Sequence, residues 1–508
     1  MLAHVRSAAL RGLDALAVSV EVDVSFGLPV FAMVGLPDAS VRESRDRVRA
    51  AIRNSGFDFP AHRITVNLAP ADVRKAGASF DLPIAVAILA AAGVVPRHDP
   101  HRLAIVGELS LDGAVLPTRG VLPVAIGLSR QGVDALMVPR GNAGEAAVVD
   151  ALRIVPVRSL AEAVGCLQQP RTDWPAAVPA ATAARRDSGD LDLADVRGQA
   201  TARRALEVAA AGGHHLLFVG PPGAGKTMLA RRLPGLLPPL AFDEALDVTA
   251  VHSVAGLLAE GSGLLAARPF RAPHHTASEA ALVGGGSVPR PGEITLAHHG
   301  VLFLDELPEF GRRALEALRQ PLEEGVVRIA RASGTVTFPA SFALIAAMNP
   351  CPCGAAGHPV LPCRCSPDAV IRYHDRVSGP LRDRLDLTIE LAPVPTEALM
   401  EGSAPGEPSA SVRARVVEAR ARQVARAHRT GATLNARLPP AALADVASLG
   451  ADAARHLSAA ARRLGLSGRA VHRALRVART IADLDAADCV DTPHLLEALQ
   501  FRATPGTP

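Results

Sequence analysis

The sequence lacks any apolar run long enough to cross a bilayer, and its longest, residues 82–95, has the length of a buried helix. We expect no secretory signal either, because Arg6, Arg11 and Asp14 interrupt the apolar stretch that such a signal needs near the N-terminus. Both features argue against a membrane partner and predict a cytoplasmic protein. Net charge is also small, at +4 over 508 residues, so any attraction to nucleic acid must come from local patches.

Lysine and cysteine are both scarce. The chain has two lysines, Lys75 and Lys226, against more than fifty arginines, which indicates a compositional bias toward arginine. Under such a bias a retained lysine is informative, because a thin and flexible ammonium side chain has been kept at that position. Four of the six cysteines fall within residues 351–365, and this clustering fits a metal in a reducing compartment better than a disulfide framework.

Residues 220–227 read GPPGAGKT and match the phosphate-binding loop pattern G-x-x-x-x-G-K-[ST] at every fixed position. A strand-like apolar run at 215–219 precedes the loop, and residues 228–233 are expected to continue as a helix, which is the setting this loop requires. Lys226 is expected to reach the terminal phosphates of a nucleotide, and the Thr227 hydroxyl to bind Mg²⁺. The predicted ATP-binding residues are Gly220, Pro221, Pro222, Gly223, Ala224, Gly225, Lys226 and Thr227.

A second motif, VLFLDE at residues 301–306, consists of four apolar residues followed by two carboxylates. This is the Walker B pattern at the end of a strand, with a separate task for each acid. We expect Asp305 to hold Mg²⁺, usually through water, and Glu306 to polarise the water that attacks the γ-phosphate. The alternative is that the paired acids cap a helix, but the phosphate loop upstream favours the catalytic interpretation.

Two further segments carry polar residues suited to phosphoryl transfer. Asn349 ends an apolar run and is expected to orient the attacking water, the role called sensor 1. Arg382 and Arg384 precede another strand-like run, and we choose Arg384 as the arginine that enters a neighbouring subunit's site and stabilises charge there. The alternative for Arg384 is a surface ion pair with Asp383 or Asp386.

A basic helix is expected after residue 466, with Ser467 as its cap and Arg469, Arg473 and Arg476 on one face. We assign Arg469 the role called sensor 2, in which a residue of the lid reports the state of the nucleotide. For Arg473 and Arg476 the alternatives are solvated surface, lid contacts and a phosphate-binding stripe.

The pattern along the chain predicts an α/β protein of two to four domains. In the first domain, periodicity predicts strands at 18–24, 31–34 and 64–68, helices at 39–55 and 82–92, and a hairpin of 104–111 with 114–117. Stretches rich in proline and glycine are expected to be linkers. The predicted organisation is an N-terminal domain 1–166, a linker 167–190, an ATPase core 191–395, a second linker 396–410 and a helical lid 411–508.

Residues 67–85, together with 107–113, resemble the Lon-protease-like fold of the ribosomal S5 domain 2 type. The resemblance places Ser79 near the nucleophile of such proteases. A serine–lysine dyad needs an amine to accept the hydroxyl proton, but the chain has Leu122 and its neighbours where that lysine is expected. Lys75, the only lysine of the domain, lies four residues from Ser79 in the same loop. We therefore expect a structural or nucleic-acid-facing domain without peptidase activity.

The phosphate loop, the acidic pair, Asn349, Arg384 and Arg469 together resemble the AAA+ superfamily. The chain further resembles the magnesium-chelatase-like branch of this superfamily, at residues 268–278, 284–286, 291–306 and 349–354. With the Lon-like domain in front, the chain resembles the YifB/ComM family over nearly its whole length. That resemblance implies a hexameric ATPase, dependent on ATP and Mg²⁺, that binds branched or single-stranded DNA and promotes branch migration of recombination intermediates during natural transformation. A ring also follows from Arg384, which has a task only in a neighbour's site.

The main alternative is an ATPase chaperone that resembles the magnesium chelatase subunit and inserts metal into a porphyrin. We do not expect such a subunit to carry the N-terminal domain or the cysteine loop, so we favour the DNA motor. An ATP-dependent peptidase is a weaker alternative, because its nucleophile would lack a base.

The cysteine loop contains two C-x-C pairs nine residues apart. Four thiolates can close a tetrahedral Zn²⁺ site, with His358 as an alternative ligand and free thiols as the alternative to a metal. This loop directly follows Asn349. If a metal ion holds the loop together, the loop is expected to move when the state of the nucleotide changes. The predicted ligands are Cys351, Cys353, Cys363 and Cys365.

The segment between the two nucleotide motifs carries adjacent histidines, His274 with His275 and His298 with His299. Adjacent side chains point to different sides of a strand or helix, so structural roles are favoured over a shared metal site. In related AAA+ proteins this insert faces the central pore. The resemblance therefore implies DNA contacts for three arginines of the insert, which are Arg268, Arg271 and Arg290.

The strongest basic patch is expected on one long helix of the lid, where Glu418 is the only countercharge. Contacts with DNA phosphates there would be independent of sequence and sensitive to salt. A solvated lid helix is the alternative. The arginines concerned are Arg413, Arg415, Arg420, Arg422, Arg426 and Arg429.

Overall fold

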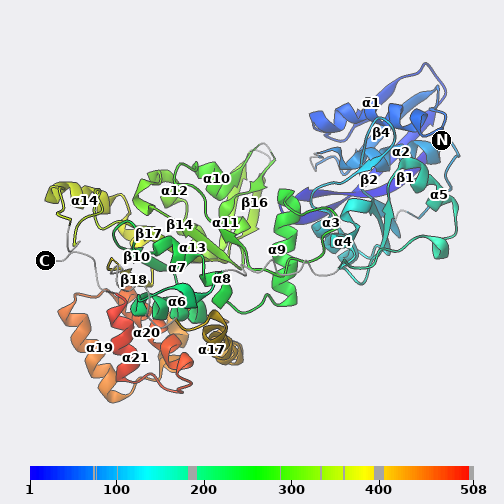
Figure 1. Ribbon diagram of the computed structural model, residues 1–508. Helices are drawn as coiled ribbons and strands as arrows, with labels where there is room; N and C mark the ends of the chain where they lie inside the picture. Colours follow the sequence, from blue (N-terminus) through cyan, green and yellow to red (C-terminus); the bar gives the residue numbers. More distant parts are fainter. Residues whose placement is uncertain are drawn as a thin grey trace.

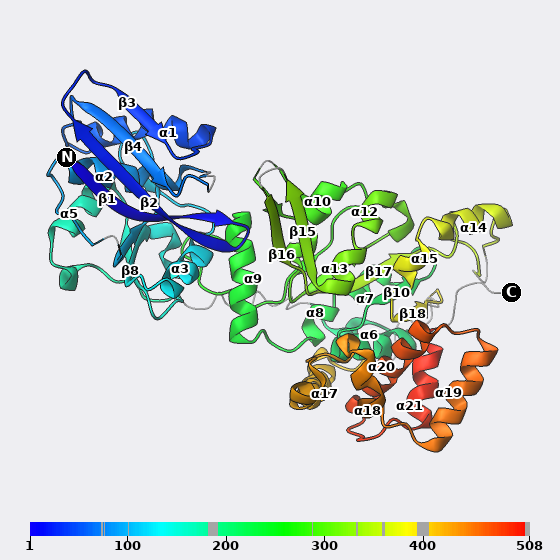
Figure 2. The same cartoon turned by 180° about the vertical axis from the view of Figure 1, so that it is seen from behind.

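The computed structural model describes residues 1–72, 75, 77–99, 101–180, 191–286, 288–331, 334–357, 361–393 and 406–502. The chain forms an N-terminal unit joined to a larger part, which holds a second sheet and a C-terminal group of helices (Figure 1). Figure 2 shows the same two parts from behind, with helix α9 (Phe242–Ala255) standing where they meet. Among the described residues, no helix combines the length and the apolar composition that a membrane span requires.

The N-terminal unit is built on a seven-stranded sheet in the order β3-β4-β2-β1-β5-β8-β9. Strands β1 and β2 form a long antiparallel hairpin that turns at Gly12, whose φ of +68° favours glycine. From β1 through β5 and β8 to β9 the pairing is parallel. The strands are β1 (Leu2–Arg11), β2 (Asp14–Ser25), β3 (Phe31–Val34), β4 (Arg63–Ala69), β5 (Leu103–Ile105), β8 (Ala135–Pro139) and β9 (Arg153–Val157).

Helix α2 (Asp81–Ala91) fills the middle of the N-terminal core and is buried along its whole length. An apolar surface on every side suits a helix that is covered all round. The predicted strands and helices of this unit are confirmed, but the predicted hairpin is shorter than expected. Residues 103–105 join the large sheet as β5, and only β6 (Glu108–Leu109) pairs with β7 (Val115–Leu116). The other helices are α1 (Ala39–Asn54), α3 (Val121–Arg130), α4 (Ala143–Ala146) and α5 (Leu160–Gln168).

Part of the stretch that the sequence analysis assigned to a linker packs on the N-terminal core. Trp174 is 2% exposed and lies in that core. The backbone N–H of Ala177 donates to the carbonyl oxygen of Ile154 in β9. Burial of a large aromatic side chain stabilises a folded unit, whereas a solvated linker would leave that side chain exposed. The described residues up to 177 therefore belong with this unit.

The second sheet is wholly parallel and has the strand order β11-β14-β17-β10-β18. Strands β10 and β14 are buried at every residue, which fits a parallel sheet covered on both faces. All five carboxyl ends therefore meet at one edge, which we call the carboxyl edge, and all five amino ends at the opposite amino edge. The strands are β10 (Leu216–Val219), β11 (Phe270–Arg271), β14 (Val301–Leu304), β17 (Ala343–Met348) and β18 (Leu387–Glu390).

The helix expected after the phosphate loop is shorter than predicted. Helix α7 (Lys226–Ala230) ends before a turn, and α8 (Leu233–Leu236) begins after it. Pro234 is the physical reason, because it lacks an N–H and its ring clashes with the carbonyl group four residues earlier. Other helices of this part are α6 (Ala200–Gly212), α10 (Glu279–Val283), α11 (Glu293–Leu296), α12 (Arg312–Glu316), α13 (Arg319–Glu324), α14 (Pro367–Asp375) and α15 (Gly379–Arg382).

Two small hairpins lie beside the second sheet, and one of them touches the N-terminal unit. They are β12 (Gly284–Gly285) with β13 (Arg290–Pro291), and β15 (Val326–Arg331) with β16 (Gly334–Pro339). An added Cβ at Gly12 would lie 2.7 Å from Cγ1 of Val336 in β16, so the tip of the β1–β2 hairpin contacts β16 closely. The N–H of Gly120 also donates to the carbonyl oxygen of Ser253 in α9 at 3.1 Å.

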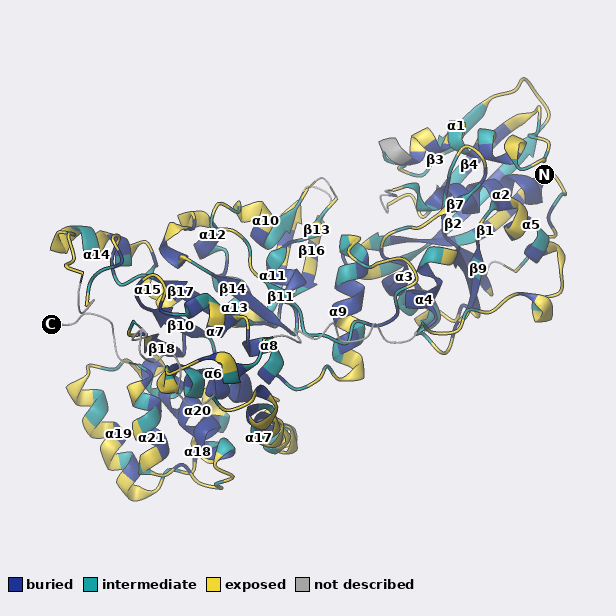
Figure 3. Ribbon diagram, viewed as in Figure 1, coloured by how far each residue is buried: buried dark blue, intermediate teal, exposed yellow. Residues whose placement is uncertain are grey.

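The C-terminal helices share a hydrophobic core with one face of the second sheet. Helices α17 and α20 both pack on α6, which connects them to the strands. Figure 3 shows buried residues concentrated along both sheets and at the inner surface of these helices, with exposed residues on their outer surface. The helices are α17 (Ser409–Thr430), α18 (Pro440–Ala447), α19 (Ala451–Arg463), α20 (Gly468–Leu484) and α21 (Thr492–Gln500).

Candidate nucleotide-binding site

The phosphate loop leaves the carboxyl end of β10, and its shape depends on glycine. Gly223 and Gly225 have φ values of +79° and +89°, a left-handed conformation that favours glycine. At Gly220 the reason is space, since an added Cβ would lie 2.8 Å from the Cβ of Leu391. Larger residues at these three positions would therefore distort the loop.

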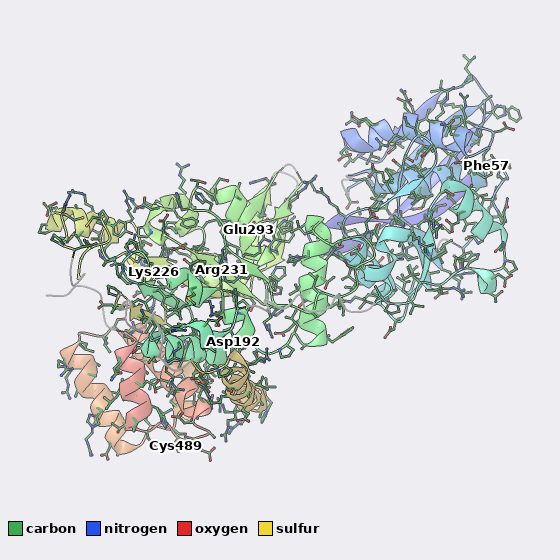
Figure 4. The ribbon with its side chains drawn as sticks, in the orientation of Figure 1. Phe57, Asp192, Lys226, Arg231, Glu293 and Cys489 are labelled. Atoms are coloured by element: carbon green, nitrogen blue, oxygen red, sulfur yellow. The ribbon has the colours of Figure 1, made fainter. Side chains whose placement is uncertain are left out.

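Lys226 is held inside this loop and is 9% exposed. Its Nζ donates hydrogen bonds to the carbonyl oxygen of Pro221 at 3.0 Å and to Oδ1 of Asn349 at 2.9 Å. Burial lowers the pKa of Lys226, and the carboxylates of Asp305 and Glu306 oppose that effect. Asn349 reaches the loop from far along the sequence because β17 lies next to β10 in the sheet. Figure 4 shows Lys226 in the middle of this part of the molecule.

Thr227 and Asp305 form a second link across the site. The Thr227 hydroxyl donates a hydrogen bond to Oδ2 of Asp305 at 2.6 Å. Asp305 follows β14, so residues after three parallel strands meet at the carboxyl edge. A hydroxyl and a carboxylate are oxygen ligands of the kind that Mg²⁺ prefers. The pair therefore fits the predicted cation.

Glu306 comes next, and its side chain is 54% exposed. Its φ of +52° is left-handed, which is uncommon for a residue with a side chain. Oε2 of Glu306 lies 3.1 Å from Nδ1 of His275. The sequence analysis did not place His275 in this site. No signal in the sequence points to it, because the parallel pairing of β11 with β14, which makes both strands end at the carboxyl edge, is decided by the tertiary structure.

The cysteine sulfurs cluster as a metal site requires. The sulfur of Cys351 lies 3.4 Å from that of Cys353 and 3.6 Å from that of Cys363, and the latter two are 3.7 Å apart. With Cys365 included, the four sulfurs lie within 4.8 Å of one another. Four sulfurs bound tetrahedrally to Zn²⁺ are about 3.8 Å apart, so the cluster fits this ion. His358, the alternative ligand, lies outside the described residues.

The cysteine cluster is attached to the phosphate loop. An added Cβ at Gly354 would lie 2.7 Å from Cδ of Pro222, so the two loops are in contact. Backbone hydrogen bonds, that from Ala355 first, lower the pKa of the Cys353 thiol to about 6, which favours its thiolate, whereas burial raises the pKa of the Cys351 thiol. The cluster thus touches the loop that is predicted to hold the phosphates.

Arg384 and Arg469 lie at the amino edge, away from the phosphate loop. Both line a cavity of about 440 Å³ where the amino ends of β10, β17 and β18 meet the C-terminal helices. Arg384 donates to the carboxylate of Glu323, while Asp383, one alternative partner from the sequence, lies 3.3 Å from Arg473. Within one chain, the structure does not bring Arg384 or Arg469 to the nucleotide motifs.

The arginines of α17 serve mainly to attach this helix, and five of the six make contacts within the chain that compete with the predicted contacts to DNA. Glu207 and Asp483 are buried carboxylates that need cationic partners, and α17 supplies them. The contacts are Arg413 with the carbonyl oxygen of Gly235, Arg415 with Glu207 and Glu407, Arg420 with the carbonyl oxygen of Ala210, Arg422 with Asp488, and Arg426 with Asp483.

Two of the three insert arginines are also held inside the chain. Arg268 donates to the carbonyl oxygen of His299 at 2.8 Å and pairs with Glu244 at the same distance. Arg271 makes two hydrogen bonds, of 2.6 and 2.7 Å, to the carboxylate of Glu293. Arg290 is exposed, so of the three arginines it is the one that is accessible as a surface cation for the predicted contact to DNA.

His298 and His299 have structural contacts, as the sequence analysis favoured. Nδ1 of His298 accepts a hydrogen bond from the N–H of Ser341 at 2.9 Å. The ring proton then sits on Nε2, which cannot act as a metal ligand in that form. Burial lowers the pKa of His298 to about 3, so the ring is neutral. His299 lies 3.5 Å from Glu244 and 3.6 Å from Asp247.

In the N-terminal unit, Lys75 is fully buried, and its ammonium donates to the carbonyl oxygen of Pro70. Burial lowers the pKa of Lys75. Ser79 lies in a short 3-10 turn (Ala78–Phe80), and Leu122, at the position where the resemblance expects a base, is buried in α3. This geometry supplies a reason why Ser79 would lack a general base.

Comparison with known proteins places these features in a family. Residues 192–399 match the family described as magnesium chelatase, subunit ChlI, residues 20–142 match subunit ChlI of Mg-chelatase, and residues 406–502 match the C-terminal part of subunit ChlI. YifB of Salmonella typhimurium is 45% identical over 510 residues, which cover 99% of this chain and 97% of the relative. The competence protein ComM of Haemophilus influenzae is 45% identical over 511 residues, with the same two coverages.

The matched families, the parallel sheet and the phosphate loop define the class, a magnesium-chelatase-like AAA+ ATPase with N-terminal, central and C-terminal parts. More narrowly, full-length identity of about 45% to YifB and ComM means that the chain belongs to the YifB/ComM family. The resemblance drawn from the sequence motifs is thereby confirmed.

Proposed function

We propose that this protein hydrolyses ATP at the carboxyl edge of the second sheet, with Mg²⁺ as cofactor. The observation that carries the proposal is the pair of hydrogen bonds from Lys226 to Asn349 and from Thr227 to Asp305, because they join three separate motifs around one loop. An ammonium, a hydroxyl, a carboxylate and an amide in this arrangement are the groups that phosphoryl transfer uses.

Each residue then has a task. Lys226 binds the terminal phosphates, and Thr227 with Asp305 would hold Mg²⁺, which neutralises charge on the phosphate oxygens. Glu306 accepts the proton of the attacking water, and Asn349 orients that water. The phosphate loop, residues 220–227, supplies backbone N–H groups to the phosphates.

We also propose a homo-oligomeric ring, of six subunits as the family resemblance implies, in which Arg384 acts on a neighbour's nucleotide and Arg469 of the lid reports the state of the nucleotide. Their position at the amino edge supports this arrangement. The four residues of β10 span about 13 Å, which exceeds the length of an arginine side chain. Arg384 and Arg469 are therefore too far to reach their own phosphate loop, and Arg384, whose side chain is 13% exposed and paired with Glu323, would have to leave that pair to act on another subunit.

The work done by hydrolysis is proposed to be DNA strand processing, in the form of branch migration during natural transformation, in the cytoplasm. It is supported by the family resemblance and by full-length similarity to a relative named as a competence protein. Exposed Arg290 is the proposed DNA contact. The alternative, an ATPase chaperone for metal insertion, is favoured by the magnesium chelatase matches, and the match of residues 20–142 means that the N-terminal unit does not exclude it.

The experiment that separates these functions is ATP hydrolysis with and without a four-way DNA junction, at two salt concentrations, with Glu306→Gln as the blank. Stimulation by DNA that weakens as salt rises is expected, because phosphate contacts release counterions. Turnover that the junction leaves unchanged would favour the chaperone. Hydrolysis by Glu306→Gln at the rate of the unmodified protein would reject the proposed site.

We propose, finally, the domain division drawn from the sequence: a Lon-like, non-catalytic domain 1–166, an ATPase core 191–395 and a helical lid 411–508, joined by linkers at 167–190 and 396–410. Trp174 and its contacts extend the first domain to about residue 177. The sequestered amine of Lys75 supports a domain without peptidase activity. The cysteine cluster is proposed to bind Zn²⁺ as a structural ion.

A further inference from the structure

The segment between β11 and α10 carries a histidine into the proposed catalytic site. Nδ1 of His275 lies 3.1 Å from Oε2 of Glu306. A carboxylate cannot donate a hydrogen bond, so this contact is favourable when Nδ1 carries a proton, and the attraction is that of an ion pair. The approach follows from the topology, because Phe270 pairs in parallel register with Val301 and both strands end at the carboxyl edge.

This segment is fixed at its N-terminal end. The ring of Phe270 stacks on that of Phe303, with centroids 6.1 Å apart. Arg271 makes two hydrogen bonds to Glu293, which belongs to α11. Two hydrogen bonds of a planar guanidinium to one carboxylate define an orientation as well as a distance. The chain therefore leaves β11 in a set direction, four residues before His275.

The C-terminal end of the segment is fixed as well. Ser278 caps α10 by accepting a hydrogen bond from the N–H of Ala281, and Leu282 of that helix is fully buried. Between the two ends, the rings of His274 and His275 lie 4.1 Å apart, and Nδ1 of His274 lies 2.9 Å from the hydroxyl of Thr276. His275 thus sits in a turn held on both sides.

The side chain of Glu306 needs a partner that holds it in one orientation. Its backbone is set by a φ of +52° and by the N–H that donates to Oδ1 of Asp305 at 3.0 Å. Its carboxylate is 54% exposed, and in the described part of the chain the charged partner within 4 Å is His275. A glutamate side chain without a partner populates several rotamers, and ordering it costs entropy.

We propose that His275 is a positioning residue for Glu306. The imidazole N–H holds Oε2, and Oε1 is left to accept the proton of the attacking water. This inference rests on the proposed function, in which Glu306 is the general base. The contact also ties the rate of hydrolysis to the place of segment 272–278, since movement of that segment would release the carboxylate.

The experiment measures steady-state hydrolysis of Mg-ATP by the full-length protein and three His275 variants. His275→Ala should lower kcat about tenfold, the order of loss that a misplaced catalytic group gives, and leave KM within about twofold. His275→Asn keeps an N–H donor where Nδ1 lies and should recover most of the loss. His275→Gln places its donor farther out, where Nε2 lies, and should recover less. His456→Ala, at an exposed histidine of α19, is the control and should keep at least about half of kcat.

The outcomes separate this inference from the proposed function. If Glu306→Gln hydrolyses ATP normally, the proposed function fails and the assignment of His275 fails with it. If Glu306→Gln is inactive while His275→Ala keeps or exceeds the normal kcat, only the role of His275 is overturned. Equal losses in the Asn and Gln variants, together with weaker binding of an ATP analogue, would show a structural role and also overturn it.

Discussion

The hydroxyl of Ser253 in α9 donates a 2.5 Å hydrogen bond to Oε2 of Glu145 in α4, and both residues are buried. This contact joins the N-terminal unit to the ATPase part, more than a hundred residues later in the chain. Asn142 donates to the other carboxylate oxygen at 2.7 Å. Donors on both oxygens offset part of the free-energy cost of burying this carboxyl group at the boundary.

Ser253→Ala should weaken this boundary in a way that depends on pH. Burial raises the pKa of Glu145, so its favourable contribution to stability is complete below the unfolded value and is lost as pH rises through the folded pKa. Without the Ser253 donor the ionised form is disfavoured further, and the free energy of unfolding should fall by about 1–3 kcal/mol at neutral pH. The loss should be smaller at pH 4. Urea unfolding at several pH values measures this difference in the free energy of unfolding between the variant and the unmodified protein.

Ser458→Ala is the control, because among the described residues the hydroxyl of this exposed serine of α19 bonds only to the carbonyl oxygen of Ala454. It should change stability by less than about 0.5 kcal/mol at either pH. A Ser253→Ala variant as stable as this control at neutral pH would show that the boundary does not depend on Glu145.

Thr227→Val should abolish most Mg²⁺-dependent hydrolysis while the fold is kept. Valine matches the shape of threonine but removes the hydroxyl that bonds to Asp305 at 2.6 Å. We expect kcat to fall by about 100-fold or more, since the cation stabilises charge in the transition state. Thr227→Ser keeps the hydroxyl and should retain activity. A Val variant that hydrolyses ATP as the Ser variant does would remove Thr227 from the metal site.

Subunits carrying Arg384→Ala and subunits carrying Glu306→Gln should each be inactive alone but regain hydrolysis when mixed. A mixed interface can combine an intact Glu306 in one subunit with an intact Arg384 in the next. Arg384 lies at the amino edge in the cavity beside Arg469, which is why it is assigned to a neighbour's nucleotide. Sedimentation with ATP gives the size of the ring. Mixtures without any activity, or a protein that sediments only as a monomer, would contradict the trans arrangement.

The purified protein should contain about one zinc ion per chain by elemental analysis. Cys353→Ser should lose that ion and lower thermal stability, because the three remaining thiolates would hold it more weakly. Cys489→Ser is a matched control, since this exposed cysteine lies in the connection between α20 and α21 (Figure 4) and is not one of the four clustered cysteines. Zinc in neither the unmodified protein nor the control would show that the four thiols are free.

Much of the site could be predicted because its motifs are local in sequence. Gly223 and Gly225 adopt left-handed backbone that few other residues tolerate, and the apolar strands before Gly220 and Asp305 are buried at every position. In such segments the short-range preference and the tertiary environment agree. The α/β pattern of the N-terminal unit was predictable for the same reason.

Other features depend on partners far along the chain. Arg420 and Arg426 resemble a DNA-binding stripe in sequence, yet one donates to the carbonyl oxygen of Ala210 and the other pairs with buried Asp483. A basic helix face looks the same whether solvent, DNA or a buried carboxylate covers it. Strand β1 was not predicted, and β5 was assigned to a hairpin, because pairing in a large sheet is decided by non-local neighbours.

The sequence by itself determined the phosphate loop, the acidic pair of Asp305 and Glu306, and the family, because each depends on residue types at fixed local spacing. Only the tertiary structure decided that Asn349 meets Lys226, that His275 meets Glu306, and that Arg384 and Arg469 lie at the amino edge. The physical reason is the parallel sheet. It collects the carboxyl ends of distant strands at one edge and their amino ends at the other, and neither the strand order nor the pairing is written in any single segment.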